Sequence, residues 1–186
     1  MGSGRSKKGS AFERVVSKQL SLWWTHGERD DVFWRTSGSG ARAKTRSKTG
    51  EKTFGQYGDV QATDPIGQPL IDWVTIEIKK GYSKNTFQDL VDAMPKQKPV
   101  FGQFIDQART DHKNAESEWW LLISKRDQRE ALVTMPLILW RFLKEYKNFN
   151  IYPRALITTS KSLQIAIITF KDFLSEIEPE FFQYGR

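Results

Sequence analysis

The chain has 186 residues, of which 38% are hydrophobic and 13% aromatic, so one domain with a sizeable core is expected and a second is not. Its 29 Lys and Arg residues outnumber its 22 Asp and Glu residues, and the net charge of +7 favours a polyanionic partner such as nucleic acid. Cysteine is absent and there are only two histidines, which excludes disulfides and cysteine-ligated zinc and leaves oxygen as the ligand atom of any metal site.

No signal for a membrane or for export is found in the sequence. No apolar run approaches the roughly 20 residues that a membrane-spanning helix needs, and the N-terminus lacks the apolar core of a signal peptide. We therefore expect a cytoplasmic protein with no membrane partner. Residues 1–9 are mostly Gly, Ser and basic residues, which predicts a disordered basic arm before a single domain over residues 10–186.

The first predicted helix runs from Ser10 to about Trp24. Ser10 and Glu13 fit a capping box, and apolar residues then recur at helical spacing. A glutamate at this position can bond back to the start of the helix or can serve a metal site. The two roles of Glu13 need not exclude each other.

A short strand over residues 32–36 precedes a segment of different composition. Residues 37–57 contain five basic residues and one acid among Gly, Ser and Thr, so they cannot contribute to a core. A solvated loop is one reading, but long loops in compact domains are usually functional or disordered. We expect a loop that binds phosphate groups and orders on DNA, with Trp34 beside it as a candidate DNA contact.

The next two strands carry the acidic residues of the candidate site. Residues 58–62 begin at Gly58-Asp59, and in the strand over residues 74–79 a period of two puts Glu77 and Lys79 on one face. If these strands are neighbours, Asp59 and Glu77 converge, and two convergent carboxylates require a cation such as Mg²⁺ or Mn²⁺ between them. Such an ion can activate water, which Lys79 would help to orient or deprotonate. The alternative is a solvated strand edge, because E-x-K triplets are common by chance.

The rest of the chain alternates helices and hairpins. Helical spacing predicts helices over residues 87–94, 101–115, 136–146 and 171–177. Strand patterns over residues 119–124 and 130–135, and again over 155–159 and 163–169, predict two hairpins. Trp23, Trp73 and Trp140 lie in apolar patterns and are expected in the core.

The order of these elements resembles the PD-(D/E)xK nuclease superfamily over roughly residues 10–125. Asp59, Glu77 and Lys79 match its motif, and Gly58 replaces the proline of the family name. The resemblance implies an α/β restriction-endonuclease-like fold, a mixed central sheet flanked by helices, with an added C-terminal β-hairpin and helix. It also implies a Mg²⁺ cofactor, for which Mn²⁺ would substitute, and a catalytic set completed by the helix acid Glu13. The implied metal ligands are Asp59, Glu77, Glu13 and Ile78.

Within this superfamily the chain is most similar to Holliday-junction resolvases of archaeal and phage type. These enzymes share the glutamate in the first helix and an arginine and serine-bearing loop, which residues 34–40 resemble, although the loop over residues 37–57 is longer here. The resemblance implies a metal-dependent endonuclease that acts in DNA recombination and cuts four-way or branched DNA. It is also compatible with a protein encoded by a phage. A restriction or repair nuclease on linear duplex and a non-catalytic DNA-binding protein are the alternatives. The expected DNA contacts are Arg35, Ser37, Ser39, Arg42, Lys44, Arg46, Lys48 and Gln107.

A junction resolvase is expected to act as a homodimer. Two nicks at symmetry-related phosphates require two sites, and a twofold pair supplies them. The strand over residues 163–168 is apolar on both faces and Phe181-Phe182 follows it, which predicts the dimer interface there. A strand buried between helices is the alternative interpretation of residues 163–168.

Overall fold

The structure is a computed structural model that describes residues 3–36, 57–146 and 152–184. Helix α1 (Ser3–Trp24) ends where it was expected to end but begins at Ser3 rather than Ser10. Ser10 and Glu13 therefore lie within the helix, and the predicted capping box is not formed. Residues 3–9, expected to be disordered, are helical, because lysine and arginine are good helix formers and an existing helix extends at little cost.

Two short antiparallel strands follow α1. Strand β1 (Phe33–Arg35) pairs with β2 (Val60–Ala62), with Arg35 opposite Val60. Two helical segments that the sequence analysis did not predict come next, the 3-10 helix η1 (Pro65–Gly67) and α3 (Gln68–Trp73). Asp64 starts them because its carboxylate accepts a hydrogen bond from the Ile66 N–H at 3.0 Å.

The central sheet has five strands. They are β3 (Val74–Lys80), β4 (Trp119–Lys125), β5 (Ala131–Pro136), β6 (Ala155–Thr158) and β7 (Gln164–Thr169). Their spatial order is β3-β4-β5-β7-β6, in which β3 and β4 are parallel and the other neighbours antiparallel. The mixed sheet and both predicted hairpins are therefore confirmed. The short helix α4 (Gln88–Asp92) and the helix α5 (Val100–Ala115) make the crossover from β3 to β4.

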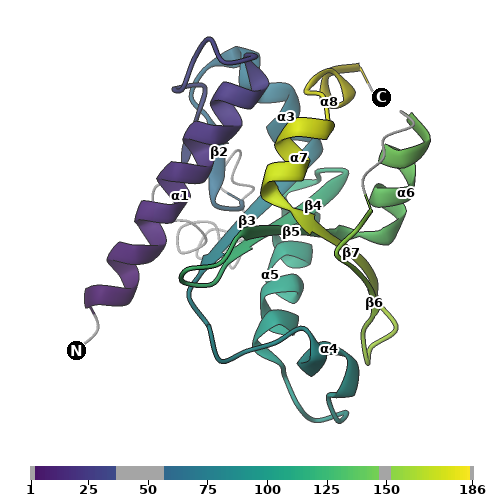
Figure 1. Cartoon of the computed structure of the whole chain (residues 1–186). Coiled ribbons are helices and arrows are strands. Elements are labelled where there is room, and N and C mark those ends of the chain that lie inside the picture. The colour runs from purple at the N-terminus through teal and green to yellow at the C-terminus, as the bar shows by residue number, and fades with distance from the viewer. Residues whose placement is uncertain (1–2, 37–56, 147–151, 185–186) are drawn as a thin grey trace.

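Helices cover both faces of this sheet, as Figure 1 shows. One face packs against α1, α3, α6 (Leu137–Tyr146), α7 (Phe170–Glu176) and α8 (Glu180–Tyr184), and the other against α4 and α5. This two-layered cover of a mixed sheet is consistent with the restriction-endonuclease-like fold. Within the described ranges, no helix combines the length and apolar character needed to cross a membrane.

The aromatic residues are placed largely as their sequence patterns predict. Trp23, Trp73 and Trp140 are buried in the core, whereas Trp34 is 47% exposed on β1. Phe181 and Phe182 are buried too, and their rings lie 5.4 and 5.7 Å from the ring of Trp73.

The dimer interface that we predicted over residues 163–168 and 181–182 is wrong in its position. Strand β7 lies inside the sheet between β5 and β6, and its apolar residues pack on both helical layers. Phe181 and Phe182 close the core from α8. Residues 165–168 and Phe181-Phe182 are buried within one chain, so they stabilise its fold rather than form an apolar surface for a second copy.

Candidate active site

The site lies at the free edge of the sheet, where Asp59 meets β3. The Asp59 N–H donates to the Ile76 carbonyl at 2.7 Å, and the Ile78 N–H donates to Asp59 Oδ2 at 2.8 Å. The strand that Asp59 precedes pairs with β1 and not with β3. The two acid-bearing segments are nevertheless neighbours, because these two hydrogen bonds hold Asp59 against the E-x-K strand.

Gly58 makes this approach sterically possible. Its φ of +75° lies in the left-handed region, and a Cβ atom added there would lie 2.8 Å from the Ile76 carbonyl oxygen and 3.0 Å from Thr75 Cγ2. Proline holds φ near −65° and cannot adopt this conformation. The structure thus accounts for glycine where the family motif has proline.

Glu77 lies on the face of β3 that packs against α5, opposite to Ile76 and Ile78. Its side chain is 1% exposed, and Oε1 accepts a hydrogen bond from Lys79 Nζ. Burial, with a further contribution from the charge of Asp59, raises the pKa of Glu77 to about 8, although Lys79 opposes the shift. Glu77 Oε2 is buried and has no hydrogen-bond partner among the described residues.

The environment of Lys79 favours the positively charged form of its side chain. Burial by itself would lower the pKa of Lys79, but the carboxylates of Glu77 and Asp59 outweigh it and raise the pKa above its usual range. The ammonium group also lies 5.7 Å from the centre of the Phe104 ring on α5. A lysine with a raised pKa is a hydrogen-bond donor and a positive charge rather than a base.

Glu13 reaches the same region from α1 but is paired with Arg35. Arg35 Nε lies 3.1 Å from Glu13 Oε2, so this arginine, expected on DNA, forms an ion pair within the chain. Burial raises the pKa of Glu13, the charge of Asp59 adds to the shift, and Arg35 partly offsets it. In the part of the chain that the structure describes, no three Asp, Glu or His side chains converge closely enough to hold a metal ion. The metal role of Glu13 therefore stays a prediction.

The oxygen atoms around Asp59 fit a hard divalent cation. Asp59 supplies a carboxylate, and Glu77 supplies the unpartnered Oε2. The Ile78 N–H points to Asp59, and since the N–H and C=O of one residue point to the same edge of a strand, the Ile78 carbonyl points there too. Two carboxylates and a carbonyl are the ligand type that Mg²⁺ and Mn²⁺ prefer.

Helix α5 places a third acid near Glu77 that the sequence analysis missed. Asp111 is buried, and its charge contributes to the raised pKa of Glu77. Phe104, Gln107 and Asp111 recur at helical spacing, so Gln107, which is half-buried, lies on the same side of α5 as the other two. An acid within an apolar helical stripe was the signal that could have identified Asp111.

Apart from Arg35 and Gln107, the predicted DNA contacts are six residues that lie between residues 37 and 56, outside the described residues. The ends of this segment nevertheless leave from the site, because Thr36 N–H donates to the Asp59 carbonyl at 3.0 Å and Tyr57 directly precedes Gly58. The six positions are Ser37, Ser39, Arg42, Lys44, Arg46 and Lys48.

Comparison with known proteins agrees with this geometry. Residues 4–183 match the model of a family described as "Phage putative PDDEXK endonuclease", a span that includes Asp59, Glu77 and Lys79. No curated protein matches the chain, and no solved structure does. The match extends over nearly the whole sequence, from α1 to α8. The chain belongs to this phage family of PD-(D/E)xK endonucleases.

Proposed function

We propose that the protein is a metal-dependent endodeoxyribonuclease that hydrolyses phosphodiester bonds in DNA. The observation that carries this proposal is the hydrogen bond from Ile78 N–H to Asp59 Oδ2. It holds one carboxylate against the strand that bears a second, buried carboxylate and a charged lysine. Family membership supports the same reaction.

The residues of the site divide into metal ligands and a charge donor. Asp59, Glu77 and the Ile78 carbonyl would hold Mg²⁺, with Mn²⁺ as a substitute, and Glu13 would join them if Arg35 turned to the DNA. The bound ion would supply an activated water molecule and neutralise charge that develops on the phosphate. Lys79, protonated because its pKa is raised by Glu77 and Asp59, would donate to the attacking water or the phosphate. It would not accept the proton.

Branched DNA, with the four-way junction as the leading form, is the substrate that we propose. The support is the similarity of the motif region to junction resolvases and the basic segment that starts and ends beside Asp59. Basic residues so close in sequence to the site would bind phosphates of a branched substrate while the scissile bond lies at the metal ligands. Linear duplex remains the second candidate, because the same site would cut it.

The test is nicking of a labelled four-way junction and of a linear duplex with the same sequence, each in Mg²⁺ or in EDTA. We expect cleavage only with Mg²⁺ and faster cleavage of the junction. Asp59→Asn and Glu77→Gln should abolish cleavage, because each removes a negative ligand. Glu145→Gln, an exposed acid on α6, is the matched control and should cut normally. Full activity of either site variant would remove the metal assignment.

A further inference from the structure

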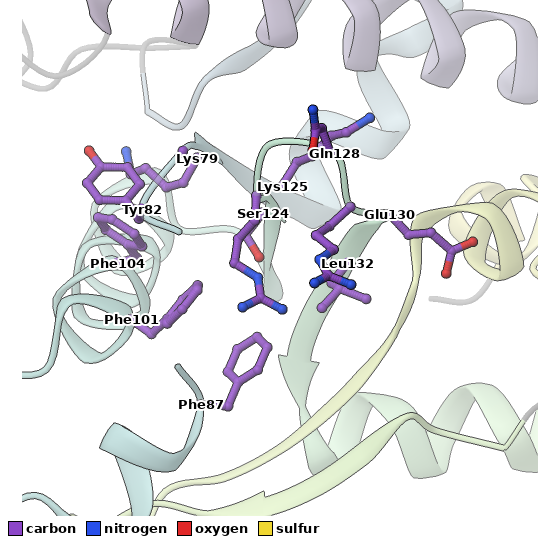
Figure 2. A pocket seen from close by; sticks show the side chains of 13 residues that line it. Lys79, Tyr82, Phe87, Phe101, Phe104, Ser124, Lys125, Gln128, Glu130 and Leu132 are labelled. Atoms are coloured by element: carbon purple, nitrogen blue, oxygen red, sulfur yellow. The ribbon is translucent and has the colours of Figure 1, made fainter. Parts of the chain in front are cut away.

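An aromatic pocket lies next to the proposed metal ligands. This open cavity of about 370 Å³ is lined by residues of α5, the loop after β3 and the β4–β5 hairpin (Figure 2). Tyr82, Phe104, Phe101 and Phe87 form a continuous series, with ring centres 4.7 Å, 5.9 Å and 4.6 Å apart from each ring to the next. Phe101 and Phe104 are buried in the core, whereas Tyr82 is exposed and Phe87 half-buried, so the two end rings of the series keep surface that faces the cavity.

Tyr82 is held in this pocket by an unusual backbone. Gly81 and Tyr82 have φ values of +100° and +61°, so two consecutive left-handed residues turn the chain immediately after β3. A non-glycine residue in this region is strained, and such strain persists where the surroundings require it. The turn sets the Tyr82 ring edge-on to Phe104, yet the residue remains 48% exposed.

The remaining wall of the pocket is rich in positive charge. Ser124 and Leu132 lie across the cavity from the rings, whereas the Lys125 ammonium points to the other face of the sheet, 6.0 Å from the centre of the Phe12 ring (Figure 2). Apart from Lys125, three cations line the pocket against a single carboxylate, Glu130. In the described ranges, neither arginine of this group forms an ion pair that would occupy it. The three cations are Lys79, Arg126 and Arg129.

The aromatic pocket is continuous with the groove that leads to the site. A second cavity of about 670 Å³ is lined by Glu13, Ile78 and Lys79 together with further lysines. The two cavities share Lys79, Gly81 and Tyr82. A ligand could therefore have one part in the groove beside the metal ligands and its neighbouring part among the aromatic rings.

We propose that the aromatic pocket receives an unpaired base of the DNA substrate while the adjoining phosphate lies at Lys79. Flat aromatic walls suit a base, and cations suit the phosphates on either side of it. A base paired within a duplex cannot enter a pocket walled on two sides, so the nucleotide must be unpaired or turned out of the helix. This inference rests on the proposed nuclease function and specifies its substrate as DNA with an unpaired nucleotide next to the scissile bond.

The experiment compares three labelled duplexes of one sequence in EDTA, by fluorescence anisotropy. One is fully paired, one carries a single unpaired nucleotide, and one carries an abasic unpaired nucleotide, which bends the DNA but has no base. Stacking of one base predicts that the unpaired nucleotide increases affinity by about 5- to 150-fold over the paired duplex. The abasic duplex should lose most of this increase.

Two variants with matched controls locate the effect. Tyr82→Leu removes an exposed ring and Arg126→Ala an exposed cation of the pocket, and both should lower the preference for the unpaired base. Tyr152→Leu, at an exposed tyrosine beside β6 on the far edge of the sheet, and Arg141→Ala on α6 should leave the preference unchanged. Thermal unfolding of each variant shows that the fold is retained.

Equal affinity for the three duplexes overturns the inference, as does a loss of preference in Tyr152→Leu equal to that in Tyr82→Leu. Cleavage of the same duplexes in Mg²⁺ separates this result from failure of the proposed function. If the protein cuts paired DNA but shows no preference, only the pocket is misassigned. If it cuts none of the DNA substrates, including the four-way junction, the nuclease proposal itself is lost.

Discussion

At the scale of single residues, Asp59 and Glu77 differ in the way each is held. Asp59 accepts a backbone hydrogen bond, whereas Glu77 is buried with one oxygen unpartnered and a pKa raised to about 8. Glu77 therefore releases its proton less readily than an exposed glutamate does. A metal ion must displace that proton before both carboxylates can act as ligands.

This difference predicts how stability depends on pH. The pKa of Glu77 is raised from 4.5 to about 8 by burial, so between these values the folded chain holds a proton that the unfolded chain has released. Its contribution to stability is complete below about pH 4.5 and is lost as the pH rises through 8. In EDTA, Glu77→Gln should flatten the fall in Tm between pH 5 and 9.

The control for this measurement is Glu145→Gln, which should keep the slope of the wild-type protein. Mg²⁺ competes with the proton on Glu77, so its addition should raise Tm more at pH 8 than at pH 6. An identical slope in Glu77→Gln and wild type would show that another group dominates the pH dependence.

Lys79 and its neighbour provide a second residue-scale prediction. Lys79→Ala should lower the cleavage rate roughly 10²- to 10³-fold, because it removes a charged donor at the developing phosphate charge. Lys80→Ala removes the same charge one position later, where the side chain lies 5.9 Å from the Phe12 ring on the opposite face of β3. Single-turnover cleavage of the two variants should differ by at least tenfold. Equal rates would show that Lys79 acts only through general positive charge.

Gly58 gives a third prediction, which separates backbone strain from loss of space. Gly58→Ala should reduce stability by about 1–2 kcal/mol from the left-handed conformation alone and should also displace Asp59, since the new Cβ would meet the Ile76 oxygen at 2.8 Å. Gly27→Ala is the matched control, because its φ is +93° and no atom lies within 4 Å of the added Cβ. Both variants should lose stability in thermal unfolding, but only Gly58→Ala should lose cleavage.

At the scale of elements, the basic segment between β1 and Asp59 carries its own prediction. Replacement of Arg42, Lys44, Arg46 and Lys48 by alanine should weaken DNA binding and flatten the dependence of log affinity on log salt by about 0.9 for each phosphate that is no longer neutralised. No core residue is removed, so Tm should remain unchanged.

A control for the basic segment removes an equal number of charges elsewhere. Alanine at four exposed cations on α5, α6 and α7 should lower affinity less and leave the salt slope closer to that of the wild-type protein. An unchanged slope in the variant of residues 42–48 would show that this segment does not contact the DNA backbone. The four control positions are Lys113, Arg141, Lys144 and Lys171.

The elements also show how far sequence reasoning extends here. The E-x-K strand and the helices after it could be predicted, because their apolar residues repeat with a clear period. Segment η1–α3 could not, because Asp64, Pro65 and Gly67 are typical of turns as well as of helix starts. The aromatic pocket was equally hidden, since its rings come from a loop, a helix and the approach to α4, which only the tertiary fold brings together.

The same reasoning failed at the C-terminus for a physical reason. Apolar residues on both faces of a strand fit either an interface or an inner strand of a covered sheet, and sequence does not separate these. Because helices cover both faces of the sheet, β7 is buried on both of its faces. Phe181 is covered in the same way by Trp73, Phe142 and Tyr146.

At the scale of the whole molecule, the open question is the number of chains that act together. A four-way junction is resolved by two nicks at symmetry-related phosphates, and this chain has one set of Asp59, Glu77 and Lys79. A closed twofold dimer would place two such sets with the symmetry of the junction. We therefore predict that the active species on junctions is a homodimer, held through a surface other than β7 and α8.

Sedimentation at micromolar concentration, with and without a four-way junction, measures the number of chains directly, and mixed dimers test whether both sites act. When wild-type protein is mixed with an excess of Asp59→Asn, most active dimers contain one working site and should nick a cruciform plasmid once instead of linearising it. Glu145→Gln in the same excess should leave linearisation intact. A monomer both free and bound to the junction would remove the resolvase assignment and leave nicking of duplex DNA, one strand at a time, as the reaction of this fold.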